Sequence, residues 1–168
     1  MTIMNVRFAL DPQDLTVEST TQLYGIGELA SIAGNSDGTN SVYIYCLSHG
    51  ALTAYVPYEI YHNGTTLITR APVTGAGLIV VPQVAVDSGA YFWGLIKGNG
   101  TCAVKQETYA AGDQLEVLTT GVLANVDGTS GATVRTVNSF AVSKATGTAA
   151  ANISVYLYGN DVTDIAGS

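Results

Sequence analysis

The sequence predicts an all-β fold, a single-domain β-barrel or sandwich of about ten short strands preceded by an irregular N-terminal arm. The composition favours strands, since the chain has 19 Gly and 10 Tyr, many Thr and Val, and only 11% charged residues. The apolar runs are short, recur every 8–12 residues or so and are separated by Gly-rich turns, as in sandwiches and barrels. No segment shows a long 3.6-residue period. A chain of 168 residues is long enough for one domain with a core of its own.

Residues 1–40 are the least regular part and are expected to form an arm with one or two leading strands. Alternation over residues 5–10 predicts a short strand, which the Asp-Pro pair that follows would end. The apolar side of this strand consists of Val6, Phe8 and Leu10. The stretch 23–33 is apolar but contains two glycines, so it does not predict a helix.

Residues 41–158 form the expected β core, and 159–168 form a polar, acidic tail. The expected strands are 42–47, 52–61 with an interruption at Pro57, 65–70, 78–86, 91–97, 101–107, 115–118, 122–126, 134–143 and 153–158. Asn63-Gly64 predicts a tight turn between two strands. Gly98-Asn99-Gly100 predicts the clearest hairpin of the sequence, between strands 91–97 and 101–107.

The charge pattern argues against a nucleic-acid partner. The net charge is −7, and the six basic residues are scattered singly, whereas phosphate binding requires clustered Lys and Arg. Anionic membrane surfaces are disfavoured for the same reason. No run reaches the ~18 apolar residues of a membrane helix, and the N-terminus lacks the order of a signal peptide. We therefore expect a soluble protein, with no membrane partner, that is synthesised in a cytoplasm.

The two cysteines, Cys46 and Cys102, lie in apolar runs and are too few for a disulfide scaffold. They are expected to be buried free thiols. A zinc site would need His49 and His62 as further ligands. Positions 46 and 49 of one strand point to opposite faces, so this alternative requires a turn between them. No metal is predicted.

Two patterns resemble enzyme signatures but lack the required context. Residues 25–30 match a dinucleotide-binding loop, and residues 34–38 match a nucleophile elbow. Neither has a buried strand before it and a helix after it. The aspartates lie mostly beside Gly, Pro, Ser or Asn, which is typical of turns. No catalytic residue and no cofactor are therefore expected, and the prediction is that the protein is not an enzyme.

Tyrosines are the remaining candidates for function, because they provide large amphipathic contact area at low entropic cost. Two pairs each share one face of a predicted strand. The candidate interface residues are Tyr43, Tyr45, Tyr156 and Tyr158, together with Val6, Phe8 and Leu10 of the arm. An alternative interpretation is that the run Tyr91-Phe92-Trp93 forms an aromatic platform that stacks on sugar rings. A Trp with apolar neighbours is, however, more often buried.

The second half of the chain resembles a known family. The run from Val86 to Gly98 is similar to a segment of tailed-bacteriophage head proteins in which Tyr, Trp and Gly recur at the spacing of Tyr91, Trp93 and Gly98. The short sequence patterns that follow this segment in the family are similar to 111–115 and 120–123 here. The closing strands of the family are similar to 138–142 and 153–157. Upstream, 34–45 is similar to its opening strand and 50–52 to its next turn. The sequence departs from the family by lacking the glycine before Ala141.

This resemblance covers about residues 25–158 and implies a capsid decoration (cement) protein. Such proteins bind the outer surface of a phage head, contact the major capsid protein and are commonly homotrimers. The resemblance therefore implies a virion protein on the outside of the capsid, with no catalytic residues. The alternative is a carbohydrate- or receptor-binding adhesin module of a phage fibre or surface protein.

Overall fold

Eleven β-strands form the regular structure in the residues that the computed structural model describes, which are 8–9, 15, 17–33, 39–72, 78–118, 120–125 and 135–159. In chain order the strands are β1 (Phe8–Ala9), β2 (Leu29–Ile32), β3 (Ser41–Leu47), β4 (Tyr58–His62), β5 (Leu67–Arg70), β6 (Leu78–Pro82), β7 (Tyr91–Val104), β8 (Gln114–Leu118), β9 (Leu123–Asn125), β10 (Arg135–Ser143) and β11 (Ala151–Leu157). The described residues contain no α-helix. The all-β, single-domain prediction is confirmed.

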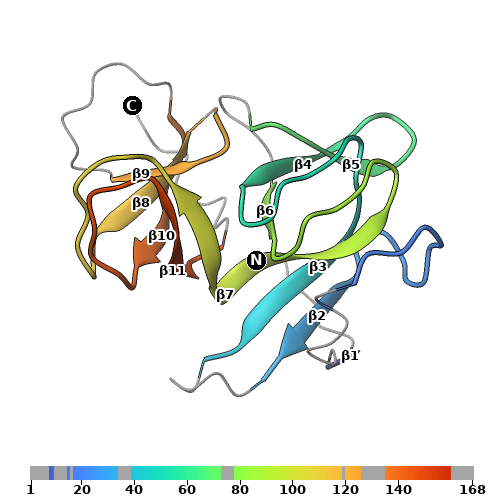
Figure 1. Cartoon of the computed structure of the whole chain (residues 1–168). Helices are drawn as coiled ribbons and strands as arrows, with labels where there is room; N and C mark the ends of the chain where they lie inside the picture. Colours follow the sequence, from blue (N-terminus) through green and yellow to red (C-terminus); the bar gives the residue numbers. More distant parts are fainter. Residues whose placement is uncertain are drawn as a thin grey trace, which may run out of the picture.

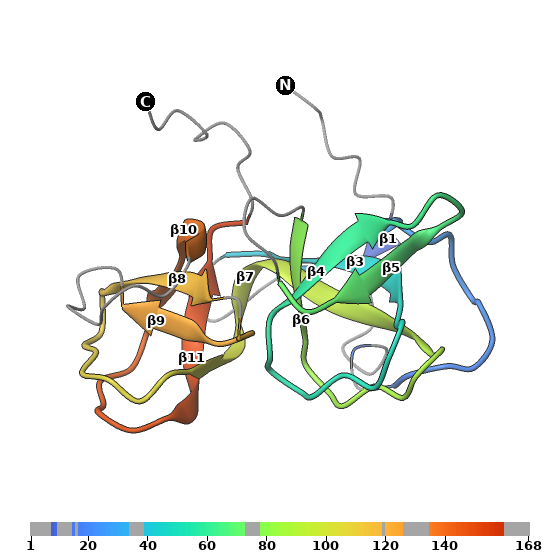
Figure 2. The same ribbon diagram turned by 90° about the horizontal axis from the view of Figure 1, so that it is seen from above.

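The strand pairings form two rings that share β7. The first ring consists of β3, β5, β4, β6 and β7, and the pairing of β3 with β7 closes it. The second consists of β7, β11, β10, β8 and β9, and the pairing of β7 with β9 closes it. Figures 1 and 2 show the two groups side by side, with β7 running from one into the other. Among the described strands, β2 pairs with β3 and extends the first ring. β1 pairs in parallel with the other edge of β2.

The predicted hairpin at 98–100 is wrong, because β7 continues through these residues as one strand of 14 residues. Residues 98–104 pair along their whole length with β11. Gly98 has a φ of 99°, and a Cβ at this position would lie 2.6 Å from the Cα of Ser41. The glycine therefore allows β3 to approach β7 closely where β7 passes between the rings, and it does not reverse the chain.

The predicted strand 52–61 is shorter than expected. Leu52 forms only an isolated bridge with Val86, and β4 begins at Tyr58, directly after Pro57. Between them Tyr55 adopts a φ of 68°. The missing N–H of proline explains why the ladder starts only after it. The turn predicted at Asn63-Gly64 is confirmed in the hairpin β4–β5, and the strands expected at 115–118 and 122–126 pair as the hairpin β8–β9.

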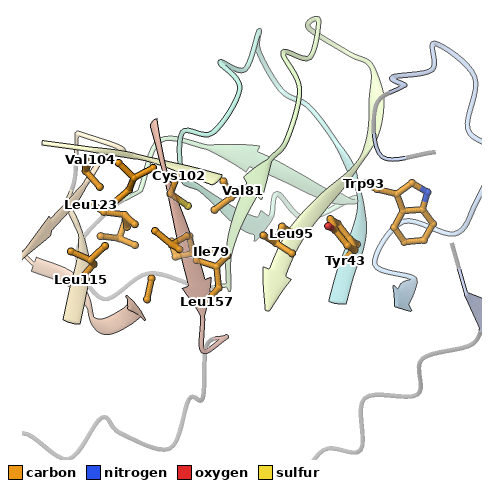
Figure 3. Close-up of a cluster of buried hydrophobic side chains, with 14 of the residues drawn as sticks. Tyr43, Ile79, Val81, Trp93, Leu95, Cys102, Val104, Leu115, Leu123 and Leu157 are labelled. Atoms are coloured by element: carbon orange, nitrogen blue, oxygen red, sulfur yellow. The ribbon is translucent and has the colours of Figure 1, made fainter. Parts of the chain in front are cut away.

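The core consists of two clusters of buried side chains. One fills the interior of the first ring and includes Ile44, Cys46, Ile60, Val80, Phe92 and Ile96. The other runs through the second ring and continues along the opposite face of β3, β6 and β7. Figure 3 shows this row, from Val104 and Leu115 at one end to Trp93 at the other. Alternation along β7 explains why Phe92 and Trp93 belong to different clusters.

Polar contacts join the two rings where β7 crosses between them. The N–H of Ala103 donates to the carbonyl of Tyr55 at 2.9 Å. The side chain of Gln83 accepts from the N–H of Thr101 at 3.0 Å and donates to its carbonyl at 3.2 Å. Gly121, in the β8–β9 turn, lies against Val56, since a Cβ at Gly121 would be 3.0 Å from the Val56 side chain. The rings are thus fixed to each other by backbone and side-chain contacts.

Candidate functional site

Four aromatic side chains pack together on the outer face of the first ring, where Tyr45 and Trp93 are buried and Tyr24 and Tyr91 are half-buried. Tyr45 of β3 is directly paired with Trp93 of β7, and their ring centroids are 5.0 Å apart. Tyr91 lies two residues before Trp93, therefore on the same face, and its ring stacks on that of Tyr45 at 6.0 Å. Tyr24 closes the group, with its ring 5.2 Å from both Tyr45 and Trp93.

The segment 17–24 borders these rings. Ser19 and Tyr91 exchange backbone hydrogen bonds of 2.8 and 2.9 Å, and the N–H of Leu23 donates to the hydroxyl of Tyr45 at 3.1 Å. A shallow hollow of about 60 Å³ results, which we call the aromatic hollow. It is lined by Val17, Ser19, Leu23, Tyr24, Tyr45, Tyr91 and Trp93. Val17 and Leu23 are 61% and 65% exposed, so the rim of the hollow is apolar and open to solvent.

Three acidic residues are neighbours of residues that line the aromatic hollow. Glu18 lies between two lining residues, and its side chain accepts a hydrogen bond from the N–H of Asp87. Asp87 is itself exposed. Glu28, whose backbone pairs with that of Tyr45, accepts a hydrogen bond from the N–H of Gly25 at 3.0 Å. Among the described residues, the charged neighbours named here are all acidic.

A second surface lies at the end of β11. Tyr156 and Tyr158 contact each other edge-to-face with ring centroids 5.9 Å apart, and Tyr158 is 42% exposed. Tyr156 lies opposite Asn99 of β7, whose side chain accepts a hydrogen bond from Lys144 at 3.0 Å. Lys97 is exposed and lies beside the end of β11, since a Cβ at Gly159 would be 3.6 Å from its side chain. We call Lys97, Lys144, Tyr156 and Tyr158 the cationic tyrosine patch.

The structure places the predicted interface residues in three different environments. Tyr43 and Tyr45 share a strand face, as expected, but are only 5% and 2% exposed, so most of their area is used inside the protomer. Burial raises the pKa of both hydroxyls. Tyr156 and Tyr158 lie at the surface. Phe8 belongs to β1 at the edge of the sheet, and Val6 and Leu10 fall outside the described residues.

The aromatic run 91–93 does not form one platform. Tyr91 and Trp93 both line the hollow, but Trp93 is only 3% exposed, and Phe92, which is 1% exposed, faces the opposite side of β7. Sequence reasoning missed Val17, Leu23 and Lys97 as surface candidates. Single apolar residues within the polar segment 17–23 were the available signal for the first two.

The thiols of Cys46 and Cys102 are free and buried, as predicted. They belong to different core clusters, and burial strongly raises the pKa of each. The described residues contain no cluster of three or more His, Cys, Asp or Glu side chains that could hold a metal ion. Residues 25–28 form a turn that leads into β2, and 34–38 lie outside the described residues.

The fold and these two surfaces define an all-β protein with an exposed apolar and aromatic surface. No family model matches the chain, and no curated protein matches it. Among solved structures, the chain is similar to the head fiber gp8.5 N base of bacteriophage phi29, with 13% sequence identity and a TM-score of 0.49. The match covers 70% of this chain and 93% of that one. Within the described part of the chain, no helix is both long and apolar enough to cross a membrane.

Proposed function

We propose that this protein is a structural component of a phage virion, a decoration (cement) protein that binds the outer surface of the head. The resemblance of residues 25–158 to tailed-phage head proteins supports this class. The observation that carries the proposal is the exposure of Val17, Leu23 and Tyr158, which leaves apolar surface for protein partners that include further copies of this chain. Contiguous exposed apolar surface is typical of sites that a protein partner covers.

The mechanism is binding without catalysis. A protein that binds only the expanded shell stabilises that shell by RT ln(1 + [L]/Kd) at each site, and the effect repeats over the lattice. The partner is the major capsid protein. A homotrimer on a symmetry axis engages several subunits at once, which raises the overall affinity without any new contact. The scarcity of charge, 11% of residues, suits a surface that is largely covered in the assembly.

Co-sedimentation with empty phage heads tests the proposal. The purified chain is mixed with expanded heads and, separately, with unexpanded proheads assembled from the major capsid protein of the same phage. We expect saturable binding to the expanded heads and an increase in the temperature at which they disrupt. Absence of binding to both forms would contradict the proposal.

The N-terminal arm is the segment proposed to reach a neighbouring subunit, with Val6, Phe8 and Leu10 as its apolar side. Deletion of residues 1–12 is expected to weaken binding to heads. The thermal stability of the truncated chain serves as the control, because the deletion also removes β1 from the edge of β2. Unchanged binding would contradict the role of the arm.

Binding to a glycan array distinguishes an adhesin from a capsid decoration protein. Decoration of a capsid predicts no glycan signal. A signal that Tyr91→Ala removes without unfolding the protein would instead favour carbohydrate binding at the aromatic hollow, where Tyr91 is the half-exposed ring.

A further inference from the structure

The three large hydrophobic side chains that are exposed among the described residues belong to two separate surfaces. Val17 and Leu23 border the aromatic hollow, whereas Tyr158 projects from the cationic tyrosine patch. The hollow lies at Tyr91 and the patch lies at Lys97, and both residues belong to β7. At ~3.3 Å per residue along a strand, these two residues are about 20 Å apart. A single copy therefore does not bring its own Tyr158 into its own hollow.

The two surfaces both expose apolar or aromatic side chains. The hollow is a concave apolar surface of about 60 Å³ floored by aromatic rings. Tyr158 is a convex aromatic side chain supported from one side by the ring of Tyr156. Aromatic residues held in this way are preferred anchors in protein interfaces, because they bury much area and lose little rotamer freedom.

The charges of the two surfaces are complementary. Glu18, Glu28 and Asp87 are neighbours of residues that line the hollow, and Lys97 and Lys144 lie around Tyr158. Contact between two hollows would bring carboxylates together, and contact between two tyrosine patches would bring amines together. Among the charged residues that the structure describes near the two surfaces, only the hollow-to-patch arrangement pairs opposite charges.

We propose that the aromatic hollow of one copy receives Tyr158 of a second copy, with Lys97 and Lys144 of the second copy facing the carboxylates around the hollow. This contact is head-to-tail, so each copy uses both surfaces and the assembly extends to a closed ring or a filament, depending on the angle between copies. The inference deepens the proposed function, since it assigns residues to the self-association that a decoration protein uses. It is tested on the purified chain without heads, so its failure is distinct from a failure of head binding.

Light scattering and sedimentation of the purified chain over a range of concentrations give the first test. We expect oligomers that dissociate as salt rises, because charges at the rim of an interface are screened at high ionic strength. Leu23→Ser and Tyr158→Ser should each weaken association by about tenfold or more. Tyr61→Ser, at a half-buried tyrosine of β4 outside both surfaces, serves as the control and should leave the mass unchanged. A chain that is monomeric at every concentration would overturn the proposal.

Mixing the two variants gives the decisive test. The Leu23→Ser copy keeps an intact Tyr158, and the Tyr158→Ser copy keeps an intact hollow. A head-to-tail contact therefore predicts that an equimolar mixture of the two monomeric variants forms dimers that cannot extend. Circular dichroism of each variant confirms that it is folded. Variants that stay oligomeric alone, or that stay monomeric when mixed, would refute the contact.

A charge exchange tests the polar part of the interface. Lys97→Glu should weaken association, and combining it with Glu18→Lys in the same chain should restore it, since each contact then pairs opposite charges again. Lys105→Glu makes the same change of charge at a lysine outside both surfaces and is the matched control. Equal effects of the two lysine variants, or no recovery in the double variant, would contradict the assigned pairing.

Discussion

Arg70 of β5 forms a two-pronged ion pair with Glu59, the residue directly opposite on β4. Both contacts, from Nε to Oε2 and from Nη2 to Oε1, measure 2.9 Å. Glu59 is 2% exposed, whereas the side chain of Arg70 is 40% exposed and lies 4.1 Å from the ring centre of Tyr61. The Glu59 carboxylate is therefore buried, and the partly exposed guanidinium of Arg70 neutralises its charge.

Removal of the arginine should destabilise the protein more than removal of the pair. Arg70→Met leaves the Glu59 carboxylate buried without its cation, whereas Arg70→Met combined with Glu59→Met leaves no buried charge. We expect the urea midpoint to fall most in the single variant and to recover in the double variant. Lys105→Met is the control for loss of a cation elsewhere. Equal midpoints for the single and double variants would show that the pair is not coupled to stability.

A side chain at position 98 should be far more disruptive than one at another left-handed glycine. Gly98→Ala places a Cβ 2.6 Å from the Cα of Ser41 at a φ of 99°, so both the backbone conformation and the contact with β3 are strained. Gly64→Ala has a similar φ of 97° but nothing within 4 Å. We expect a loss of about 1–2 kcal/mol for Gly64→Ala, from the left-handed conformation alone, and a clearly larger loss for Gly98→Ala. Urea denaturation measures both, and equal losses would contradict the close approach of β3 to β7.

Burial of the two thiols predicts a loss of stability in alkaline solution. In the folded protein the pKa of Cys46 and Cys102 lies well above the ordinary value of 9.0, so above pH 9 the unfolded chain binds fewer protons than the folded chain. The contribution of the thiols to the free energy of unfolding should therefore be constant below pH 8 and fall above pH 9, by up to about 1.4 kcal/mol per pH unit for each thiol.

Denaturation of a Cys46→Ala/Cys102→Ala variant is the matched measurement. Between pH 8.5 and 9.5 its stability should depend less on pH than that of the natural chain, even though its absolute stability is lower. A thiol reagent should react with the natural chain only as fast as it unfolds. Rapid reaction of either thiol in the folded protein would contradict the burial.

Trp93 is expected to contribute mainly to the stability of the folded protein. It is 3% exposed and packs against Tyr45 and Tyr24, so Trp93→Ala should lower the free energy of unfolding by about 3–5 kcal/mol. Tyr91→Ala, at the half-exposed ring of the same hollow, should cost less. Chemical denaturation compares the two, and a larger loss for Tyr91→Ala would show that the hollow is packed differently.

Most of the strands, but not their order in the sheet, could be predicted from local patterns. Alternation and turn residues were sufficient for β3, for the hairpins β4–β5 and β8–β9, and for the strands near 135–143 and 151–157, because pleat alternation and tight-turn chemistry are encoded within a few residues. The error at 98–100 arose because Gly-Asn-Gly is also compatible with a strand when another backbone must approach it. Which of the two forms depends on distant segments, namely Ser41, 57 positions earlier in the chain, and residues 155–157 of β11, which pair with 98–100.

The candidate site depended more on tertiary structure. The sequence alone determined an all-β chain with few charges, two buried thiols and clusters of tyrosines. Two tyrosines separated by one residue on a strand share a face, but the sequence does not say whether that face is inside or outside. The tertiary structure decided that Tyr43 and Tyr45 are buried, whereas Tyr158 is exposed. It also brought the segment 17–24 over β3 and β7, since contacts between residues so far apart in the chain form only when the whole sheet closes.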